Sequence, residues 1–201
     1  RHKTYKYIVG VDEAGRGPLA GPLAIGAVAW PVSYAFQKKF ANVRDSKQLS
    51  AIRREYFFKT LYEEQARGAI ICCVVFITPR MIDAHGLTKA LRCGVARALD
   101  KLFCLRTSSI RVVLDGSLVA PPEYEQQTII RGDETVPIIS AASIIAKVSR
   151  DRYMVRLAKK YPKYGFEKHK GYGTKAHYEA LQKQGISPIH RRLFLRTWTR
   201  F

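Results

Sequence analysis

The sequence predicts an α/β fold in which a mixed sheet is covered by helices. Short apolar segments of strand length cluster early in the chain, and later ones alternate with longer helical segments. The length of 201 residues is enough for one domain with a real core, with or without a small appendage. A composition of 47% hydrophobic and 25% charged residues is typical of a globular protein and excludes a disordered one.

Each strand is expected where an apolar run ends at a turn or at polar residues. Residues 7–11 end at Asp12 and Glu13, and a Gly/Pro-rich turn separates them from the next apolar run. The other expected strands are residues 23–30, 69–77, 110–114 and 128–130. No apolar run approaches the roughly 20 residues of a membrane helix, so no membrane span is expected. Residues 1–4 are basic but lead into no long apolar segment, so no secretory signal is expected either.

Four helices are expected, each next to a capping or breaking residue: residues 51–67, 79–103, 140–161 and 176–184. Ser50 is typical of an N-cap for the first helix, and Gly68 ends it. The second helix is expected to be interrupted near Gly86. We expect residues 1–161 to form the main domain and residues 162–201 to form a small helical region packed on it.

The chain carries a large excess of positive charge. Its 35 Lys+Arg against 16 Asp+Glu give a net charge of +19, of which residues 151–201 contribute +10. This excess predicts a polyanionic partner, most simply nucleic acid, and the alternatives are a solvated basic surface or an anionic membrane surface. The aromatic residues of the same region either stack on nucleotides or pack a small helical cap.

The four cysteines form no C-x-x-C pair, and they are Cys72, Cys73, Cys93 and Cys104. Cys72 and Cys73 are adjacent in an apolar run, so they would point to opposite faces of a strand. We interpret all four as reduced, structural thiols of a cytoplasmic protein, in preference to a zinc site or a disulfide.

Acidic residues stand out in so basic a chain where they follow apolar strands. Asp12 and Glu13 follow the first strand, Asp115 follows the fourth and Asp133 follows the short fifth one. Ligands of α/β proteins usually bind at strand ends, and carboxylates that meet there repel one another unless cations neutralise them. Oxygen ligands suit Mg²⁺ or Mn²⁺, and two such ions about 4 Å apart clamp a phosphodiester for hydrolysis. The alternative is that these acids are N-caps and surface ion pairs.

Two further polar segments accompany these acids. Gly15, Arg16 and Gly17 come directly after Glu13, where flanking glycines let the backbone approach a ligand and expose its N–H groups. This placement predicts a loop laid against a nucleic-acid backbone. Lys47, in a second polar segment, is either a contact for a substrate phosphate or half of a surface ion pair.

At this level of detail the sequence resembles the type 2 ribonucleases H, the ribonuclease HII family. The resembling segments follow the family's order: residues 9–22 (VGVDEAGRGPLAGP), 45–49 (DSKQL), 114–116 (LDG), 131–133 (RGD), 140–151 (SAASIIAKVSRD), 169–174 (HKGYGT) and 190–192 (HRR). The chain departs from the pattern at Arg131, where the family usually has Lys. Together the segments span nearly the whole chain.

The resemblance implies a ribonuclease H-like fold, with a mixed five-stranded sheet flanked by helices and a small helical C-terminal region. It implies an endonuclease that cuts the RNA strand of RNA/DNA hybrids. It also implies cutting on the 5′ side of single ribonucleotides embedded in duplex DNA, which leaves 3′-hydroxyl and 5′-phosphate ends. The implied catalytic residues and ligands of the two Mg²⁺ or Mn²⁺ ions are Asp12, Glu13, Asp115 and Asp133.

The resemblance also implies how substrate is held. The backbone of Gly15, Arg16 and Gly17 would contact the 2′-hydroxyl and nearby phosphates, since this hydroxyl separates RNA from DNA. Tyr172 would stack on the sugar beyond the RNA–DNA junction. We also expect substrate contacts from His169 and Lys170, although His169 and His190 are equally interpreted as structural.

Other interpretations remain open at this point. Lys147 and Asp151 are predicted to form a structural pair, and Ser143 to pack near the site without belonging to a nucleophile set. A non-catalytic basic nucleic-acid-binding protein is the main alternative function. A type 3 ribonuclease H is disfavoured because only six residues precede the first strand, and Tyr172 disfavours a nuclease that cuts DNA alone. No obligate protein partner is expected.

Overall fold

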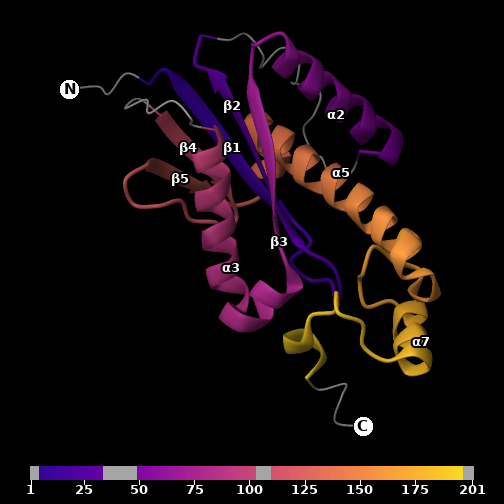
Figure 1. The fold of residues 1–201 in the computed structure, drawn as a ribbon. Helices are drawn as coiled ribbons and strands as arrows, with labels where there is room; N and C mark the ends of the chain where they lie inside the picture. Colours follow the sequence, from indigo (N-terminus) through magenta and orange to yellow (C-terminus); the bar gives the residue numbers. More distant parts are fainter. Residues whose placement is uncertain (1–4, 34–48, 103–109, 197–201) are drawn as a thin grey trace.

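The structure is a computed structural model that describes residues 5–33, 49–102 and 110–196 (Figure 1). The predicted substrate contact Lys47 and the cysteine Cys104 lie outside the described residues.

Five strands form one mixed sheet: β1 (Tyr7–Ala14), β2 (Leu23–Pro31), β3 (Ile71–Ile77), β4 (Ile110–Asp115) and β5 (Glu125–Ile129). Their order across the sheet is β3-β2-β1-β4-β5. The pairs β1–β2 and β2–β3 are antiparallel, whereas β1–β4 and β4–β5 are parallel. The central strand β1 therefore ends at the same edge of the sheet as β4 and β5. This arrangement confirms the predicted mixed five-stranded sheet.

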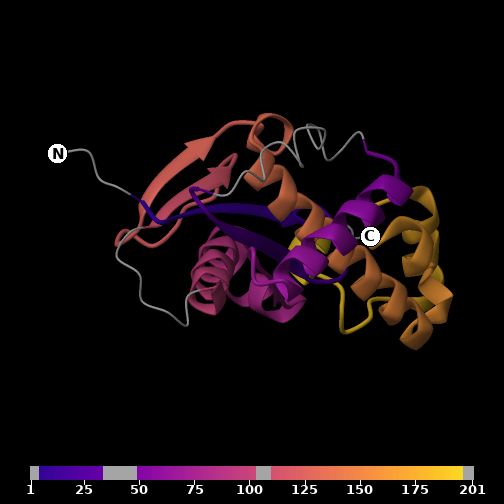
Figure 2. The same ribbon diagram turned by 90° about the horizontal axis from the view of Figure 1, so that it is seen from above.

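The sheet is covered by helices on both faces, and a series of short helices follows: α2 (Ala51–Ala66), α3 (Pro79–Leu102), α4 (Gly132–Thr135), α5 (Pro137–Lys160), the 3₁₀ turn η2 (Pro162–Tyr164), α6 (Phe166–His169), α7 (Lys175–Gln184) and the 3₁₀ turn η3 (Arg192–Leu195). Helix α3 packs on one face of the sheet, against a core that includes Val11 and Ile25. Helices α2 and α5 pack on the other face, with Val28 and Val113 (Figures 1 and 2).

Helix boundaries follow the predicted signals closely. The Ser50 hydroxyl accepts the Arg53 N–H and caps α2, as predicted. Gly86 has a φ of 76° inside α3 and interrupts it at the predicted place. Helix α5 begins earlier than predicted, at Pro137, because proline suits the first turn of a helix, where its missing N–H is not needed.

The most informative differences from the predicted strand bounds concern β1 and β5. β1 continues through Asp12 and Glu13 to Ala14, because Ala14 still pairs with Ala24 of β2. β5 lies earlier than the predicted residues 128–130. It is an edge strand whose polar residues satisfy one ladder of hydrogen bonds with β4, so it has no apolar pattern to reveal it.

The C-terminal region packs on the main domain through a third core. This core joins the loop after β1, helix α5 and the C-terminal helices, and its buried members are Leu19, Ala20, Met154, Ala158, Tyr164, Phe166, Leu181 and Leu195. Tyr164 and Phe166 are buried and stack with ring centroids 5.3 Å apart, so these two aromatics pack the region's interior. Tyr172 is 40% exposed and remains available at the surface. The division at residues 161 and 162 stays a prediction.

The described cysteines are free thiols. Burial raises the pKa of Cys72 to about 12 and that of Cys73 to about 11, which keeps both protonated. Over the residues that the structure describes, no helix combines the length and the apolar character needed to cross a membrane.

Candidate active site

Three of the four predicted acids meet at one edge of the sheet. Asp12 and Glu13 lie near the end of β1, and Asp115 is the last residue of β4. β1 and β4 are parallel, with Val11 opposite Leu114, so Asp12 and Asp115 follow side by side. The register of the two central strands therefore assembles the carboxylates.

The carboxylates act on one another electrostatically. Burial, followed by the Glu13 charge, raises the pKa of Asp12 well above its usual value, against hydrogen bonds from Ser143 and the Glu13 N–H. The pKa of Glu13 is also raised, mainly by burial, although the Arg16 guanidinium opposes this from 3.4 Å. The Asp115 charge raises the pKa of both Asp12 and Glu13. Like charges forced together in this way are typical of a site that receives a cation.

Asp133 lies directly behind Asp115. Its N–H donates to Asp115 Oδ1 at 3.2 Å, and its carbonyl accepts the Ser140 hydroxyl at 2.6 Å. Its side chain is completely buried, and it does not line the pocket described next. The structure thus brings Asp133 to the cluster through its backbone, and its role as a metal ligand stays a prediction.

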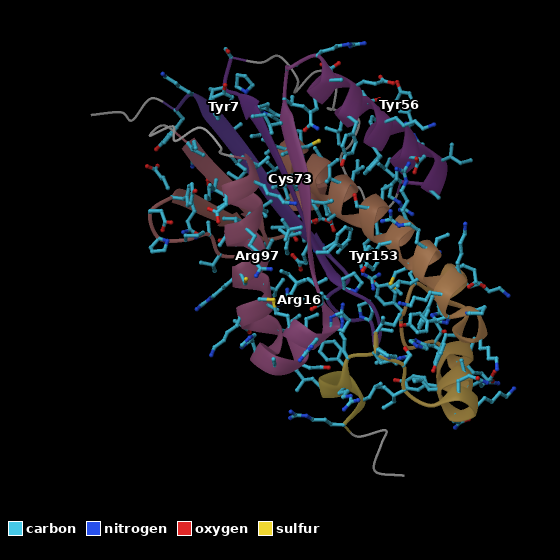
Figure 3. All side chains as sticks on the ribbon, in the orientation of Figure 1. Tyr7, Arg16, Tyr56, Cys73, Arg97 and Tyr153 are labelled. Atoms are coloured by element: carbon cyan, nitrogen blue, oxygen red, sulfur yellow. The ribbon has the colours of Figure 1, made fainter. Side chains whose placement is uncertain are left out.

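A pocket of about 370 Å³ opens over the carboxylates. Its walls come from β1, the loop after β1, α2, β4, α5 and the C-terminal region: Asp12, Glu13, Ala14, Gly15, Arg16, Gly17, Arg54, Asp115, Ser143, Ile144, Lys147 and Tyr172. Figure 3 labels Arg16, whose guanidinium reaches Glu13 and the Ser117 hydroxyl. The pocket therefore joins the predicted acids, the predicted glycine-rich loop and Tyr172 in one site.

Two basic pocket residues were not identified as site residues from the sequence. Arg54 comes from α2, where its Nη1 donates to the Leu49 carbonyl at 2.7 Å. Lys147 forms the predicted pair with Asp151 at 3.0 Å, and its Nζ also lies 5.9 Å from the Tyr172 ring centroid. Among so many basic residues, only the packing of α2 and α5 distinguishes these two.

His169 and Lys170 lie outside the pocket lining. The His169 Nε2 lies 2.8 Å from the Tyr164 carbonyl, and its Nδ1 accepts the Gly171 N–H. The Lys170 ammonium donates to the Glu167 carbonyl. Both ring nitrogens of His169 are therefore engaged within the C-terminal region, which favours its structural interpretation. Substrate contacts by these two residues stay predictions.

A chain of hydrogen bonds links two buried histidines to Tyr172. The Tyr172 carbonyl can only accept, so the proton on His177 lies on Nδ1, at 2.9 Å from that oxygen. His177 Nε2 then accepts from His190 Nε2 at 3.0 Å, and His190 Nδ1 accepts from the Ser187 N–H and hydroxyl. This chain requires that both rings are neutral.

The histidine chain predicts a loss of stability in acid. Burial, and then the His177 charge, lower the pKa of His190 to about 4, whereas an unfolded histidine titrates near about 6.5. The unfolded chain therefore binds the extra proton first. The contribution is complete above pH about 6.5 and falls by about 3 kcal/mol as the pH approaches about 4.

This stability loss can be measured by urea unfolding between pH 7.5 and 4.5. His190→Asn should flatten the pH dependence, and His85→Asn, at an exposed position on α3, should leave it unchanged. A His190→Asn profile parallel to that of the wild type would contradict this account.

A mixed sheet whose parallel strands end in clustered carboxylates, within a strongly basic chain, defines a class of metal-dependent nuclease. The chemistry of the donor set suits divalent cations, because it offers only oxygen atoms that repel one another. Among the described residues, however, no three carboxylates are already arranged around one ion position. The ribonuclease HII family model matches residues 9–197. The chain therefore belongs to the ribonuclease HII family.

Curated relatives carry the same family name over most of their length. A ribonuclease HII of Clostridioides difficile is 40% identical over 194 residues, which cover 96% of this chain and 72% of the relative. A ribonuclease HII of Caldicellulosiruptor bescii is 42% identical over 195 residues, with 97% and 89% covered. This agreement favours the type 2 family over the type 3 interpretation and does not favour the non-catalytic alternative.

Solved structures confirm the fold. Ribonuclease H2 from Pyrococcus horikoshii has a TM-score of 0.70 at 30% identity, covering 95% of this chain and 96% of that one. RNase HII from Archaeoglobus fulgidus, solved in complex with PCNA, has a TM-score of 0.71 at 28% identity, covering 92% and 93%. Bst-RNase HIII in complex with Mn²⁺ shares the fold with a TM-score of 0.67 at 16% identity, covering 96% of this chain and 65% of that one.

Proposed function

We propose that this enzyme hydrolyses the RNA strand of RNA/DNA hybrids and cuts on the 5′ side of single ribonucleotides embedded in duplex DNA. The products would carry 3′-hydroxyl and 5′-phosphate ends, and the cut at a single ribonucleotide would open ribonucleotide excision repair. The observation that carries this proposal is the shared pocket of the carboxylates and the Gly15-Arg16-Gly17 loop. Membership of the ribonuclease HII family supports the substrate class.

The proposed cofactors are two Mg²⁺ or Mn²⁺ ions held by Asp12, Glu13 and Asp115, with Asp133 as the fourth ligand. Cations would relieve the repulsion and burial that raise the pKa of Asp12 and Glu13. Bound there, the ions would activate a water molecule and stabilise the leaving oxygen. The Mn²⁺ complex of Bst-RNase HIII, which has the same fold, makes these metals the first to test.

The chain's own residues would orient the substrate around the acids. The basic side chains of Arg16, Arg54 and Lys147 line the pocket and would contact backbone phosphates. Tyr172, exposed at the pocket wall beside Lys147, would stack on the deoxyribose that follows the ribonucleotide. Ribose carries an additional hydroxyl there, so a closely packed ring favours the DNA sugar.

Replacing Tyr172 by alanine tests the stacking role. We expect kcat/KM on a duplex with one ribonucleotide to fall about tenfold, which takes the lower part of the roughly 1–3 kcal/mol known for rings stacked on bases as the guide for a ring packed on a sugar. The loss on a long hybrid should be smaller, since RNA there offers many alternative registers. Tyr172→Phe should retain activity, and Tyr178→Ala, an exposed tyrosine outside the pocket lining, serves as the control. Equal losses on both substrates would count against stacking.

The proposed activity is tested with a labelled DNA duplex that contains one ribonucleotide. Cleavage is measured with Mg²⁺, with Mn²⁺ and with EDTA, beside an all-DNA duplex. A metal-dependent cut 5′ of the ribonucleotide, with the all-DNA duplex intact, is the expected result. Tight binding without cleavage in either metal would support the non-catalytic alternative instead.

The proposed partners are the nucleic acids themselves, with no obligate protein partner. The complex with PCNA is a property of the Archaeoglobus fulgidus relative. We place the enzyme in the cytoplasm, where free thiols such as Cys72 and Cys73 are maintained.

A further inference from the structure

Two completely buried arginines, Arg150 and Arg191, donate hydrogen bonds to backbone carbonyls of the loop after β1, residues 15–22. Arg191, next to η3, donates from Nη2 to the Gly15 carbonyl at 2.6 Å and from Nη1 to the Arg16 carbonyl at 3.0 Å. Its Nε donates to the Gly21 carbonyl at 3.0 Å. One guanidinium therefore binds carbonyls at both ends of the loop. Gly15 and Arg191 are 176 positions apart in the sequence.

The direction of these bonds determines where the loop's N–H groups point. In a planar trans peptide, the carbonyl of one residue and the N–H of the next point in opposite directions. Because the Gly15 and Arg16 carbonyls point at Arg191, the N–H groups of Arg16 and Gly17 point away from it. Gly15, Arg16 and Gly17 all line the pocket over the carboxylates.

We propose that Arg191 is the positioning residue that directs the Arg16 and Gly17 N–H groups into the pocket, where they bind the 2′-hydroxyl or a phosphate oxygen at the cut. The inference rests on the proposed function for the identity of that ligand. Arg191 itself does not touch substrate. It acts through the loop, and the C-terminal region thereby completes the site of the main domain.

Arg150 supports the other side of the same loop. Its Nε donates to the Pro22 carbonyl at 2.9 Å, and its Nη2 reaches the carbonyls of Ala20 and Lys170 at 3.3 and 3.0 Å. A Cβ on Gly15 would lie only 1.9 Å from Arg150 Nε, so the loop rests directly on this side chain. The two arginines thus leave the loop little freedom to turn its carbonyls outward.

Burying the two positive charges of Arg150 and Arg191 is unfavourable, which argues that their hydrogen bonds to the loop are a specific feature of the fold. Among the residues with described positions, no carboxylate lies within ion-pair distance of Arg150 or Arg191. Burial and the neighbouring Arg150 charge lower the pKa of Arg191 to about 9. Hydrogen bonds to backbone carbonyls are what compensates the burial of these charges. A planar guanidinium presents N–H donors from three separate nitrogens in fixed directions, whereas the ammonium of lysine has all its donors on one nitrogen and cannot reach three separated carbonyls.

Arg191→Lys is the test, since it keeps the charge and removes the fork of donors. We expect kcat on a single-ribonucleotide duplex to fall about 100-fold, as when one preorganised donor is misplaced, with KM changed less than about threefold. Arg192→Lys is the matched control, because the neighbouring Arg192 side chain is exposed and its backbone N–H, which donates to Asp83, is unchanged. It should retain activity within about twofold.

A second measurement does not depend on catalysis and begins with the wild-type protein. In ¹⁵N-glycine-labelled wild-type protein with EDTA, the Gly17 amide signal should shift more with the ribonucleotide duplex than with an all-DNA duplex. In folded Arg191→Lys that difference should disappear. The inference would be overturned by a wild-type Gly17 amide signal that shifts equally with both duplexes. It would also be overturned by a folded Arg191→Lys protein with wild-type kcat. A wild-type enzyme that cuts nothing, yet shows the Gly17 shift, would instead refute the proposed function alone.

Discussion

Replacing Asp12 by asparagine is expected to lower cleavage at least about 1000-fold, which corresponds to about 4 kcal/mol of transition-state stabilisation. Asp12 is only 3% exposed and lines the pocket together with Glu13 and Asp115, so asparagine removes one of the proposed anionic ligands. Affinity for an RNA/DNA hybrid should change less than about threefold, because the basic side chains that we propose to bind phosphates remain. Single-turnover cleavage and filter binding measure the two effects separately.

The same substitution is expected to stabilise the enzyme when metal is absent. The pKa of Asp12 is raised in the folded protein, so the folded state binds more protons than the unfolded chain just above the ordinary carboxyl pKa. The metal-free wild type should therefore gain stability as the pH falls through the raised pKa. Asparagine removes the buried charge, so Asp12→Asn should unfold at a higher temperature in EDTA at pH 7.

Asp100→Asn provides the matched control for both effects. Asp100 is exposed on α3, on the opposite face of the sheet from α5, and the substitution makes the same chemical change. It should alter neither cleavage nor the unfolding temperature. Wild-type turnover in Asp12→Asn would refute the catalytic assignment. A lower unfolding temperature in EDTA would show that the hydrogen bonds of Asp12 outweigh its unfavourable burial.

Replacing Gly26 by alanine is expected to cost about 3 kcal/mol or more of stability, at the upper end of the range for overpacked cores. A Cβ at this position of β2 would lie 2.2 Å from the Ala142 carbonyl oxygen and 2.7 Å from the Ala146 nitrogen. Both atoms belong to the backbone of α5, which cannot rotate away as a side chain can. In a chain of this size the unfolding temperature should fall by about 10 °C.

Gly17→Ala is the control for this stability measurement. Nothing lies within 4 Å of a Cβ at Gly17, and its φ is not in the left-handed region. Its unfolding temperature should stay within about 2 °C of the wild type. An equal change in both variants would show that α5 does not approach the sheet as closely as described.

The close approach of α5 also concerns the site. Gly10 of β1 faces the Ile138 carbonyl in the same way, so α5 lies directly on both central strands. Ser143 and Lys147 of this helix reach the pocket only because the helix backbone is that near. A partly folded Gly26→Ala enzyme should therefore lose activity together with stability.

The fold could be predicted from the sequence to the extent that local patterns encode it. The Ser50 cap, the Gly86 interruption and the apolar strands were confirmed, because each depends on neighbouring residues. The polar edge strand β5 was misplaced, since its mostly exposed positions at the sheet edge need no apolar pattern. The position of Asp12 and Asp115 directly after apolar runs likewise predicted them as site residues.

The rest of the site depends on packing that no local pattern expresses. Arg150 and Arg191 are two of 35 basic residues, and only the structure shows that they are buried beneath the loop. Arg54 comes to the pocket because α2 packs beside α5. The depth of Asp133 behind Asp115 follows from the α4 turn. These features require the complete fold.

The bond between Arg191 and Gly15 has a consequence for the order of events during synthesis. Its partners are 176 residues apart, and such distant contacts close late because the intervening chain must first be ordered. A nascent chain that has already formed β1, with Asp12 and Glu13 in place, still lacks the guanidinium that holds its loop. On the proposed role of Arg191, a chain that ends before residue 191 lacks the guanidinium that positions the loop, so we expect cleavage to require synthesis past that residue.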